Sequence, residues 1–418
     1  MFRAVKGTRD IAPEEMEKIL YIVDKIKEMC KLYGFLPLET PALESFELLA
    51  KKSGAGIKDE IYYFRDKGGR ELGLRFDLTT SLARFVANNP NLIKPFKRYQ
   101  IGRVWRYDNP QKGRYREFWQ ADMDIVGSKS MLADTECIAL ACEILKKTGL
   151  GSFVIRINNR KISEAIALKS GVKRNKIIEV FRVLDKLDKI GKDSVEKELL
   201  KMGAGKVINF LDKVEGEDLS FIEREVKGIK TGEEGVGEIR EILRYAGMFG
   251  IREYLKVDLS LVRGLDYYTG PVFEIDAGYG LSVGGGGRYD KLIGLIGNYD
   301  VPAVGISFGI DRLIDLMNER GIKIGRDEEK VFIAVISKEL IKDYIMIANK
   351  LRERGIVVEM DIMDRGLRNQ LEYASKSNFK YVIFLGKREK AQGIVKIRDM
   401  ESGKEEEVKI NDIKRFFK

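Results

Sequence analysis

The fold is decided by Arg103-Val104-Trp105-Arg106-Tyr107-Asp108 and, beyond a short basic loop, by Tyr115-Arg116-Glu117-Phe118-Trp119-Gln120. Each run is rich in aromatic and apolar residues that alternate with polar ones, which is typical of a strand. We therefore predict two long antiparallel strands, at 97–108 and 115–127, joined by a loop at 109–114.

Polar side chains of this hairpin gather on one side. Because side chains two residues apart share a face of a strand, Arg106 lies with Asp108 on the first strand. On the returning strand, Gln120 lies with Asp122 and Asp124. Arginines suit the binding of phosphate, whereas carboxylates suit a ligand with a positive charge or an N–H group. The hairpin is therefore either one wall of a binding site, with a basic loop that could contact nucleic acid, or an exposed surface of salt bridges.

A second polar cluster, Arg263-Gly264-Leu265-Asp266-Tyr267-Tyr268-Thr269-Gly270, precedes a strand predicted at 271–275. Its arginine cannot act as a base, because its pKa is above about 12, but it can hold an anionic oxygen in a fixed fork geometry. Its tyrosines can stack on a flat ligand and bond to its polar edge. These residue types suit a small molecule that carries a ring and a phosphate or carboxylate. The alternative is a strand that begins among ordinary surface residues.

Three shorter motifs also carry polar or conformational signals. Asp77 and Thr79 share one face of an extended chain, although either could instead cap the helix predicted after them. Four glycines at 284–287 could let the backbone approach a ligand closely. Arg312 falls in the first turn of a predicted helix, where the helix dipole also favours anions, but a lone arginine there is more often merely exposed.

Composition points to a protein of more than one domain. The chain has 418 residues, of which 44% are hydrophobic and 33% charged, and this length exceeds what one core usually supports. No apolar run approaches the roughly 20 residues that span a bilayer. The N-terminal residues lack the apolar core of a secretory signal, so we expect a cytoplasmic protein that does not enter a membrane.

The chain contains no histidine, which removes imidazole acid–base catalysis and every histidine-containing metal site. Cys137 and Cys142 lie five residues apart in a helical pattern, so they do not form a zinc pair; with Cys30 they fit buried thiols in a reducing compartment. We therefore expect no metal site made by the protein alone. The formal net charge of +10 suits a polyanionic partner such as nucleic acid.

The order of the predicted elements divides the chain. Residues 14–33 form an amphipathic helix, and the prolines of the extended segment 35–44 exclude it from the centre of a sheet, so we expect an edge or an interface there. Residues 172–248 are mostly helical and resemble an inserted domain. After a polar, glycine-containing linker at 321–330, strands and helices alternate, which predicts a compact α/β domain with a mostly parallel sheet.

Taken in order, these motifs resemble those of the class II aminoacyl-tRNA synthetases, and in particular the histidyl-tRNA synthetase family. Residues 17–44 resemble class II motif 1, a helix and a proline-bearing strand at the dimer interface of that class. Residues 98–124 resemble motif 2, and residues 304–313 resemble motif 3. The segments 263–270 and 286–290 are similar to two stretches that are peculiar to the histidyl branch.

The resemblance implies an α+β catalytic domain with a mostly antiparallel sheet, the class II synthetase fold, over residues 1–325. A helical insertion would interrupt it at about 171–250, and a C-terminal α/β anticodon-binding domain would occupy residues 330–418. The resemblance also implies a homodimer formed through residues about 17–44. The partners it implies are tRNA(His), ATP and L-histidine.

The reaction implied by the resemblance is the ATP-dependent attachment of histidine to tRNA(His) through a histidyl-adenylate, with Mg²⁺ accompanying ATP. By resemblance, Arg106 holds the α-phosphate of ATP, Arg114 contacts the outer phosphates and Arg312 holds the γ-phosphate. Arg263 binds the carboxylate of the substrate and the α-phosphate, as a fixed cation for the charge that develops in the transition state. Arg263 and Arg106 are thus the implied catalytic residues.

The histidine pocket of the family falls on Asp77, Thr79, Gln120, Asp124, Arg263, Tyr267 and Tyr268. The first three would bind the α-ammonium group, whereas Asp124 and Tyr268 would lie at the imidazole. Acceptors at these two positions could bond both ring nitrogens of histidine. This would select histidine, because a substrate without these ring nitrogens would leave the buried acceptors unpaired.

The chain departs from the family pattern at some positions, and other functions compete with this one. Asp77 and Asp124 replace the glutamates of bacterial members, as in the archaeal and eukaryotic branch, whereas the loop at 110–113 is short, as in bacterial members. The main alternative is the synthetase-like regulatory subunit of ATP phosphoribosyltransferase, which usually lacks the C-terminal domain and much of the 263–270 segment. The others are a synthetase for another amino acid and a nucleic-acid-binding protein with an inactive site.

Overall fold

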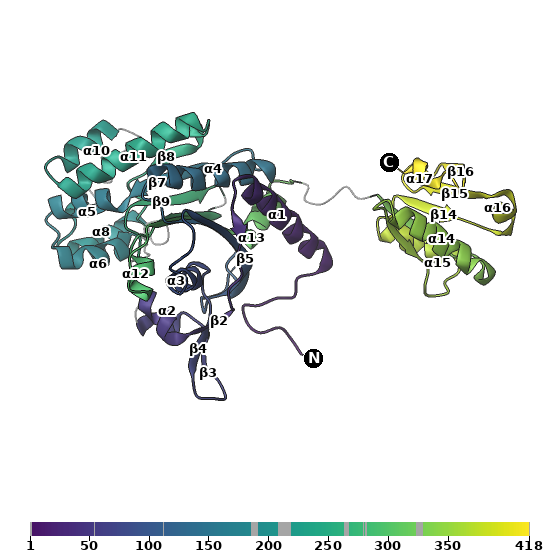
Figure 1. Cartoon of the computed structure of the whole chain (residues 1–418), viewed down its shortest axis with the longest axis horizontal. Helices are drawn as coiled ribbons and strands as arrows, with labels where there is room; N and C mark the ends of the chain where they lie inside the picture. The colour runs from purple at the N-terminus through teal and green to yellow at the C-terminus, as the bar shows by residue number, and fades with distance from the viewer. Residues whose placement is uncertain are drawn as a thin grey trace. The chain divides into compact units, whose positions relative to one another are not determined.

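The computed structural model describes residues 2–53, 55–111, 113–184, 191–207, 219–262, 267–278, 280, 282–322 and 329–417. Contacts divide the chain into two compact units, Met1–Ile324 and Gly325–Lys418, and each is described by itself (Figure 1). Among the described helices, none is long and apolar enough to cross a membrane.

An eight-stranded sheet forms the centre of the first unit. Its strands lie in the order β1 (Leu36–Pro37), β5 (Phe96–Trp105), β6 (Glu117–Val126), β11 (Ala303–Gly309), β10 (Gly284–Arg288), β9 (Pro271–Asp276), β7 (Val154–Asn159) and β8 (Leu255–Val257). Only the outermost pairs, β1 with β5 and β7 with β8, are parallel. The prediction of a mostly antiparallel sheet is therefore confirmed, and the proline-bearing segment lies at one edge, as its missing N–H donors require.

The predicted hairpin forms as β5 and β6, beside the edge strand β1, but it is shorter than expected. Strand β5 ends at Trp105, so the placement of Arg106 and Asp108 on one strand face was wrong. The backbone leaves the hairpin at this point because the N–H of Tyr107 bonds to the carbonyl oxygen of Glu60, 2.8 Å away, in another segment. Asp108 thereby lies in the loop with the basic residues that follow it.

One face of the sheet is covered by helices that share a single large core. These helices are α1 (Pro13–Leu32), α4 (Met131–Lys147), α5 (Arg160–Lys169), α10 (Leu219–Val226), α11 (Lys230–Met248) and α13 (Ile310–Glu319). Helix α1 begins at Pro13, which needs no N–H partner in the first turn, and ends before Gly34, whose φ of 74° suits glycine. In Figure 1, α4 and α11 lie on this side of the curved sheet, whereas α3 (Thr79–Ala87) lies on the other.

The other face is only partly covered. Helices α3 and α12 (Leu292–Ile296) pack together over one end of it. Beside them, a small sheet with the order β2 (Leu43–Ser45), β4 (Glu71–Leu74) and β3 (Tyr63–Arg65) packs with α2 (Phe46–Ser53). The uncovered part of the face leaves space for a ligand.

The stretch predicted as a helical insertion at about 171–250 has two environments. Helices α6 (Ile177–Leu184) and α8 (Lys192–Lys201) form a small hydrophobic cluster, separate from the main core, to which Ala167 of α5 and Val262 also contribute. Helices α10 and α11, in contrast, bury Ile222, Ile239 and Ile242 in the main core. The separate helical cluster therefore lies in the first part of this stretch, because the apolar face of α11 completes the layer over the sheet.

The second unit consists of β12 (Lys330–Ala334), α14 (Ile341–Arg352), β13 (Val357–Met360), α15 (Leu367–Lys376), β14 (Tyr381–Phe384), α16 (Lys387–Gln392), β15 (Ile394–Asp399), β16 (Glu405–Lys409) and α17 (Ile413–Phe416). Its sheet has the order β13-β12-β14-β15-β16, in which the first three strands are parallel and the last two antiparallel to their neighbours. The expectation of a mostly parallel sheet was wrong, because the short segment around α16 returns the chain directly beside β14 and no long crossover follows.

A buried ion pair joins the end of β10 to the start of α4. Arg288 is 2% exposed and Asp134 is fully buried. The Nε of Arg288 lies 3.2 Å from Oδ1 of Asp134, and its Nη2 bonds to Oδ2. Nη1 and Nη2 also donate to the carbonyl oxygens of Ser128 and Ser130, at 2.8 and 3.2 Å. Burial raises the pKa of Asp134 to about 6, although the charge of Arg288 opposes this shift.

We predict that Arg288→Leu lowers the free energy of unfolding by about 3–5 kcal/mol, because it leaves the carboxylate of Asp134 buried without its partner. Urea denaturation followed by circular dichroism measures this loss. The matched control is Lys291→Ala, which removes a pair with Asp300 whose side chains are 72% and 53% exposed and should leave the transition unchanged. Equal transitions for Arg288→Leu and the unaltered chain would contradict the prediction.

Candidate active site

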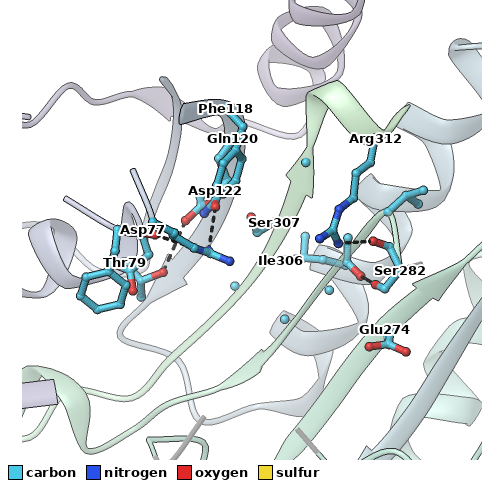
Figure 2. A pocket seen from close by; sticks show the side chains of 18 of the residues that line it. Asp77, Thr79, Phe118, Gln120, Asp122, Glu274, Ser282, Ile306, Ser307 and Arg312 are labelled. Atoms are coloured by element: carbon cyan, nitrogen blue, oxygen red, sulfur yellow. Dashed lines mark hydrogen bonds between the residues drawn. The ribbon is translucent and has the colours of Figure 1, made fainter. Parts of the chain in front are cut away.

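A pocket of about 780 Å³ lies over the centre of the large sheet, on the face that the helical core does not cover. Its lining comes from strands β6, β10 and β11, from the segment before α3, from the loop after β5 and from the start of α13. Figure 2 shows Asp77, Thr79, Gln120 and Asp122 gathered on one side of the pocket, and Arg312 with Ser282 on the other.

Glycines make the floor of the pocket. The glycine run at 284–287 is the central strand β10 rather than a loop, and β11 contributes Gly305 beside it. A Cβ atom at Gly305 would lie 2.0 Å from Oδ1 of Asp124, and one at Gly286 would lie 1.9 Å from the carbonyl oxygen of Gly305. The absence of side chains here therefore makes room for Asp124 and lets a ligand approach the backbone of the sheet.

One end of the pocket is a network of acceptors. The Nε2 of Gln120 donates to Oδ1 of Asp122 at 2.8 Å, and the hydroxyl of Thr79 lies 3.4 Å from Oδ2 of the same carboxylate. Asp77 lines the same end, and its Oδ1 accepts the N–H of Thr80 at 2.9 Å. The prediction that Asp77 and Thr79 share one face of an extended chain was wrong, because Leu78 is already helical and α3 begins at Thr79. Asp77 accepts an N–H group in the first turn of α3, as the capping alternative requires, and it also lines the pocket.

Burial raises the pKa of Asp122, which is 2% exposed, above its ordinary value. The positive charge of Arg98 and hydrogen bonds from Ser307 and Gln120 oppose this shift, while the charge of Asp77 adds to it. Two neighbouring carboxylates in a poorly hydrated site repel each other, so a ligand with a positive charge between them is favoured.

A second part of the lining combines a carboxylate with tyrosines. Asp124 is 2% exposed and accepts a hydrogen bond from the hydroxyl of Tyr289. The rings of Tyr267 and Tyr268 lie 4.6 Å apart between centroids, and Tyr267 meets Tyr289 edge to face at 6.0 Å. All four residues line the pocket. The arrangement suits a flat ring that carries an N–H group.

Arginines line the remainder. The Nε of Arg106 donates to the carbonyl oxygen of Phe76 at 3.0 Å, and its Nη2 lies 3.3 Å from Oε1 of Gln120. Arg114 is held by the carboxylate of Asp108 at 2.9 Å. Arg312 donates from Nη1 to the carbonyl oxygen of Ser282 at 2.8 Å. These hydrogen bonds and the ion pair hold Arg106 beside Gln120 and Arg312 on the opposite side of the pocket, and the three guanidinium groups can bind phosphate oxygens.

The described part of the pocket therefore brings together Asp77, Thr79, Gln120, Asp124, Tyr267, Tyr268, Arg106, Arg114 and Arg312. Arg263 lies outside the described residues. In the described part of the chain, no group of three or more cysteine, aspartate or glutamate side chains is placed to hold a metal ion.

Comparison with known proteins identifies the family. The family model for histidyl-tRNA synthetase matches residues 7–313. The chain belongs to the histidyl-tRNA synthetase family. A second family model, for an anticodon-binding domain, matches residues 330–418.

Relatives of this family resemble the chain over its whole length. The histidine–tRNA ligase of Pyrococcus furiosus is 37% identical, over 100% of this chain and 99% of that protein. A crystal structure of histidyl-tRNA synthetase from Nostoc sp. PCC 7120 is 30% identical and superposes with a TM-score of 0.86, over 100% of both chains. An ATP phosphoribosyltransferase regulatory subunit/histidyl-tRNA synthetase from Bacillus halodurans C is 26% identical with a TM-score of 0.77, over 92% of this chain and 98% of that one.

Three residues in or directly behind this pocket had no role predicted from the sequence. Asp122 was placed on the correct strand face but given no function. Arg98 shares the two-residue alternation of Arg106, and the hairpin register pairs it directly with Asp124, so the alternation contained a signal for it. Tyr289 belongs to the 286–290 segment, but nothing in its local sequence indicates that its hydroxyl reaches Asp124.

We predict that Gly305→Ala destabilises the catalytic unit by about 1–3 kcal/mol, because the added methyl group overlaps the carboxylate of Asp124 and displaces it from its partners. The matched control is Gly237→Ala in α11, where an added Cβ meets no atom within 4 Å. This control should be stabilised by about 0.5–1 kcal/mol, as expected for alanine inside an exposed helix. Thermal denaturation of both variants measures the difference, and a Gly305→Ala variant as stable as the control would refute the steric argument.

Proposed function

We propose that this chain attaches histidine to tRNA(His) in two steps, with ATP consumed and a histidyl-adenylate as the intermediate. The observation that carries the proposal is the single pocket that joins an acidic, N–H-accepting part to an arginine-lined part. Histidine offers an α-ammonium group and a ring with an N–H group, whereas ATP offers phosphates. The family membership of the chain supports the same assignment.

The acceptor network would hold the α-ammonium group. In this proposal Asp77, Thr79 and Gln120 contact the ammonium, while Asp122 fixes the hydroxyl of Thr79 and the amide of Gln120 from behind. The imidazole would lie against Tyr267 and Tyr268, with Asp124 accepting a ring N–H. Such a pocket discriminates strongly against side chains that cannot satisfy its buried acceptors.

The first step forms an anhydride. A carboxylate oxygen of histidine attacks the α-phosphorus of ATP, the bond from this phosphorus to the oxygen of the β-phosphate breaks, and pyrophosphate leaves. Arg106 would hold the α-phosphate, Arg114 the outer phosphates and Arg312 the γ-phosphate. Arg263 would bind the reacting carboxylate and the α-phosphate. The nucleophile is already ionised, so the step needs no general base, and fixed cations stabilise the charge of its transition state.

Mg²⁺ would enter with the phosphates of ATP, whose charge it neutralises when bound. Magnesium ions in such sites are held by substrate phosphates and water and by one or two carboxylates. Glu274 is a carboxylate that lines this pocket, on the side of Arg312 and Ser282 (Figure 2). The residues present therefore fit a magnesium ion that is carried mainly by ATP.

In the second step a ribose hydroxyl of the terminal adenosine of tRNA would attack the carbonyl carbon of the adenylate, and AMP would leave. The loop at 109–114 would approach the acceptor end, and residues 330–418 would bind the anticodon.

Since this reaction serves translation, we infer a cytoplasmic location. We also propose a homodimer through residues about 17–44, where Leu32 and Leu36 are 71% and 60% exposed.

The alternative, a regulatory subunit of ATP phosphoribosyltransferase, would need neither the arginines nor an anticodon-binding domain. The pocket of this chain contains Arg106, Arg114 and Arg312, and residues 330–418 match the anticodon-binding family. Both features favour the synthetase.

We predict that the purified protein exchanges labelled pyrophosphate into ATP only when histidine is supplied. Exchange is measured with each standard amino acid in turn. Arg106→Ala protein purified in the same way should lose the exchange, which excludes activity carried over from the expression host. Exchange with no amino acid would refute the synthetase, and exchange with a different one would refute the assignment of the pocket.

We predict that Arg263→Ala lowers the exchange rate by about 10²–10³-fold, the usual effect of removing a group that stabilises transition-state charge. Arg244→Ala, which alters an arginine that is 56% exposed on α11, is the control and should retain full activity. Circular dichroism and thermal denaturation verify that both variants fold. Normal exchange in Arg263→Ala would show that this arginine has no catalytic role.

A further inference from the structure

Arg98 lies directly behind the tyrosine-lined part of the pocket. Its side chain is 0% exposed, and its Nη2 lies 2.8 Å from Oδ2 of Asp124. The same atom is 3.4 Å from the carbonyl oxygen of Leu78. Register places Arg98 opposite Asp124 on strands β5 and β6. A guanidinium group keeps its proton in proteins, so the carboxylate of Asp124 has a permanent positive charge beside it, on the side away from the pocket.

Tyr289 occupies the other oxygen of the same carboxylate. Its hydroxyl donates to Oδ1 of Asp124, and the side chain is 2% exposed. Burial raises the pKa of Tyr289 well above its ordinary value, so the phenol remains a donor. A carboxylate can accept about four hydrogen bonds. Asp124 can therefore accept an N–H group of a ligand in addition to the contacts with Arg98 and Tyr289.

We propose that Arg98 is a positioning residue that restricts the pocket to an uncharged ring. By balancing the charge of Asp124, it makes this carboxylate a hydrogen-bond acceptor for neutral imidazole rather than a counter-ion for imidazolium. The inference rests on the proposed function, because it concerns the form of histidine that the same pocket accepts.

The charges around Asp124 support this assignment. An imidazolium against Asp124 would bring a second positive charge close to Arg98. Asp124 is 2% exposed and Arg98 is 0% exposed, and like charges repel more strongly in such buried surroundings than in water. Asp122 and Asp77 are further carboxylates of the pocket, and the charge of Arg98 also acts on Asp122. Both lie in the acceptor network, where the proposed α-ammonium group would balance them.

Three tyrosines and a thiol also face Asp124. Tyr267 and Tyr268 approach from the segment before β9, and Tyr289 from the end of β10. Cys137 of α4 lies beneath the sheet, and burial raises its pKa well above the ordinary value, so it remains a thiol. Arg98 is therefore the charged group that decides which form of the ring Asp124 accepts.

The test compares histidine with its triazole analogue, whose ring stays uncharged between about pH 5 and pH 8, whereas the histidine ring titrates in this range. Isothermal titration in two buffers of different ionisation enthalpy gives the affinity and the number of protons exchanged. The triazole analogue reports protons that move elsewhere in the pocket, so the difference between the two ligands isolates the ring.

For the unaltered protein we expect histidine to bind with release of a ring proton at acid pH, and its dissociation constant to rise about tenfold per pH unit below the ring pKa. In Arg98→Met the buried carboxylate has lost its partner, so binding of the neutral triazole should weaken on the order of 10- to 100-fold. Histidine should then bind with less proton release and with little loss at acid pH. Arg98→Lys retains the cation and should retain the original pH dependence.

Identical pH dependence in the unaltered protein and in Arg98→Met would overturn the proposal, as would tighter binding of histidine at acid pH by the unaltered protein. If Arg98→Met does not fold, Tyr289→Phe provides the test. This variant removes a donor but no charge, so the affinities for histidine and for the triazole analogue should fall equally at every pH. A changed pH dependence of histidine binding would contradict the assignment to Arg98. Failure of the unaltered protein to bind either ligand would instead refute the proposed function.

Discussion

Strand β6 serves two environments, and the rest of the catalytic unit depends on its alternation. Ala121, Met123 and Ile125 are buried in the helical core, whereas Gln120, Asp122 and Asp124 line the pocket on the opposite face. A slip of one residue in its pairing with β5 would place two carboxylates in the apolar core. Ten residue pairs between β5 and β6, from Phe96–Val126 to Trp105–Glu117, hold this register. The pairing of these two strands therefore stabilises the fold and also directs the acceptor side chains into the pocket.

Buried charges in this unit are balanced locally. Arg98 with Asp124 lies under the pocket, and Arg288 with Asp134 lies where β10 meets α4. Each pair joins elements that are distant in sequence or on neighbouring strands, and each guanidinium also bonds to backbone carbonyls. Desolvation makes an unpaired charge costly in such positions, so these pairs specify one arrangement of the elements even where they add little net stability.

The residues that line the pocket suit a reaction that uses no histidine side chain of the protein. Arginines supply charge that does not vary with pH, and the proposed nucleophile is the carboxylate of the substrate itself. The pocket therefore needs donors and acceptors in fixed positions more than it needs a group that exchanges protons. The glycines of β10 and β11 contribute by leaving the floor open, which lets side chains from β6 and a ligand share the space above the sheet.

The sequence by itself determined the antiparallel hairpin, the edge position of the proline-bearing segment and the common face of Gln120, Asp122 and Asp124, because these follow from two-residue alternation across a short loop or from the missing N–H of proline. The mostly antiparallel order of the whole central sheet came from the resemblance of the motifs to the class II synthetases. Only the tertiary structure decided that β5 ends at Trp105, that the glycine run is a central strand, that α11 belongs to the main core and that the C-terminal sheet is mixed. It also decided that Arg98 and Tyr289 meet Asp124. These features depend on contacts between segments far apart in the chain, such as the bond from Tyr107 to Glu60 and that from Tyr289 to Asp124, and local patterns carry no record of which distant partner a side chain will meet.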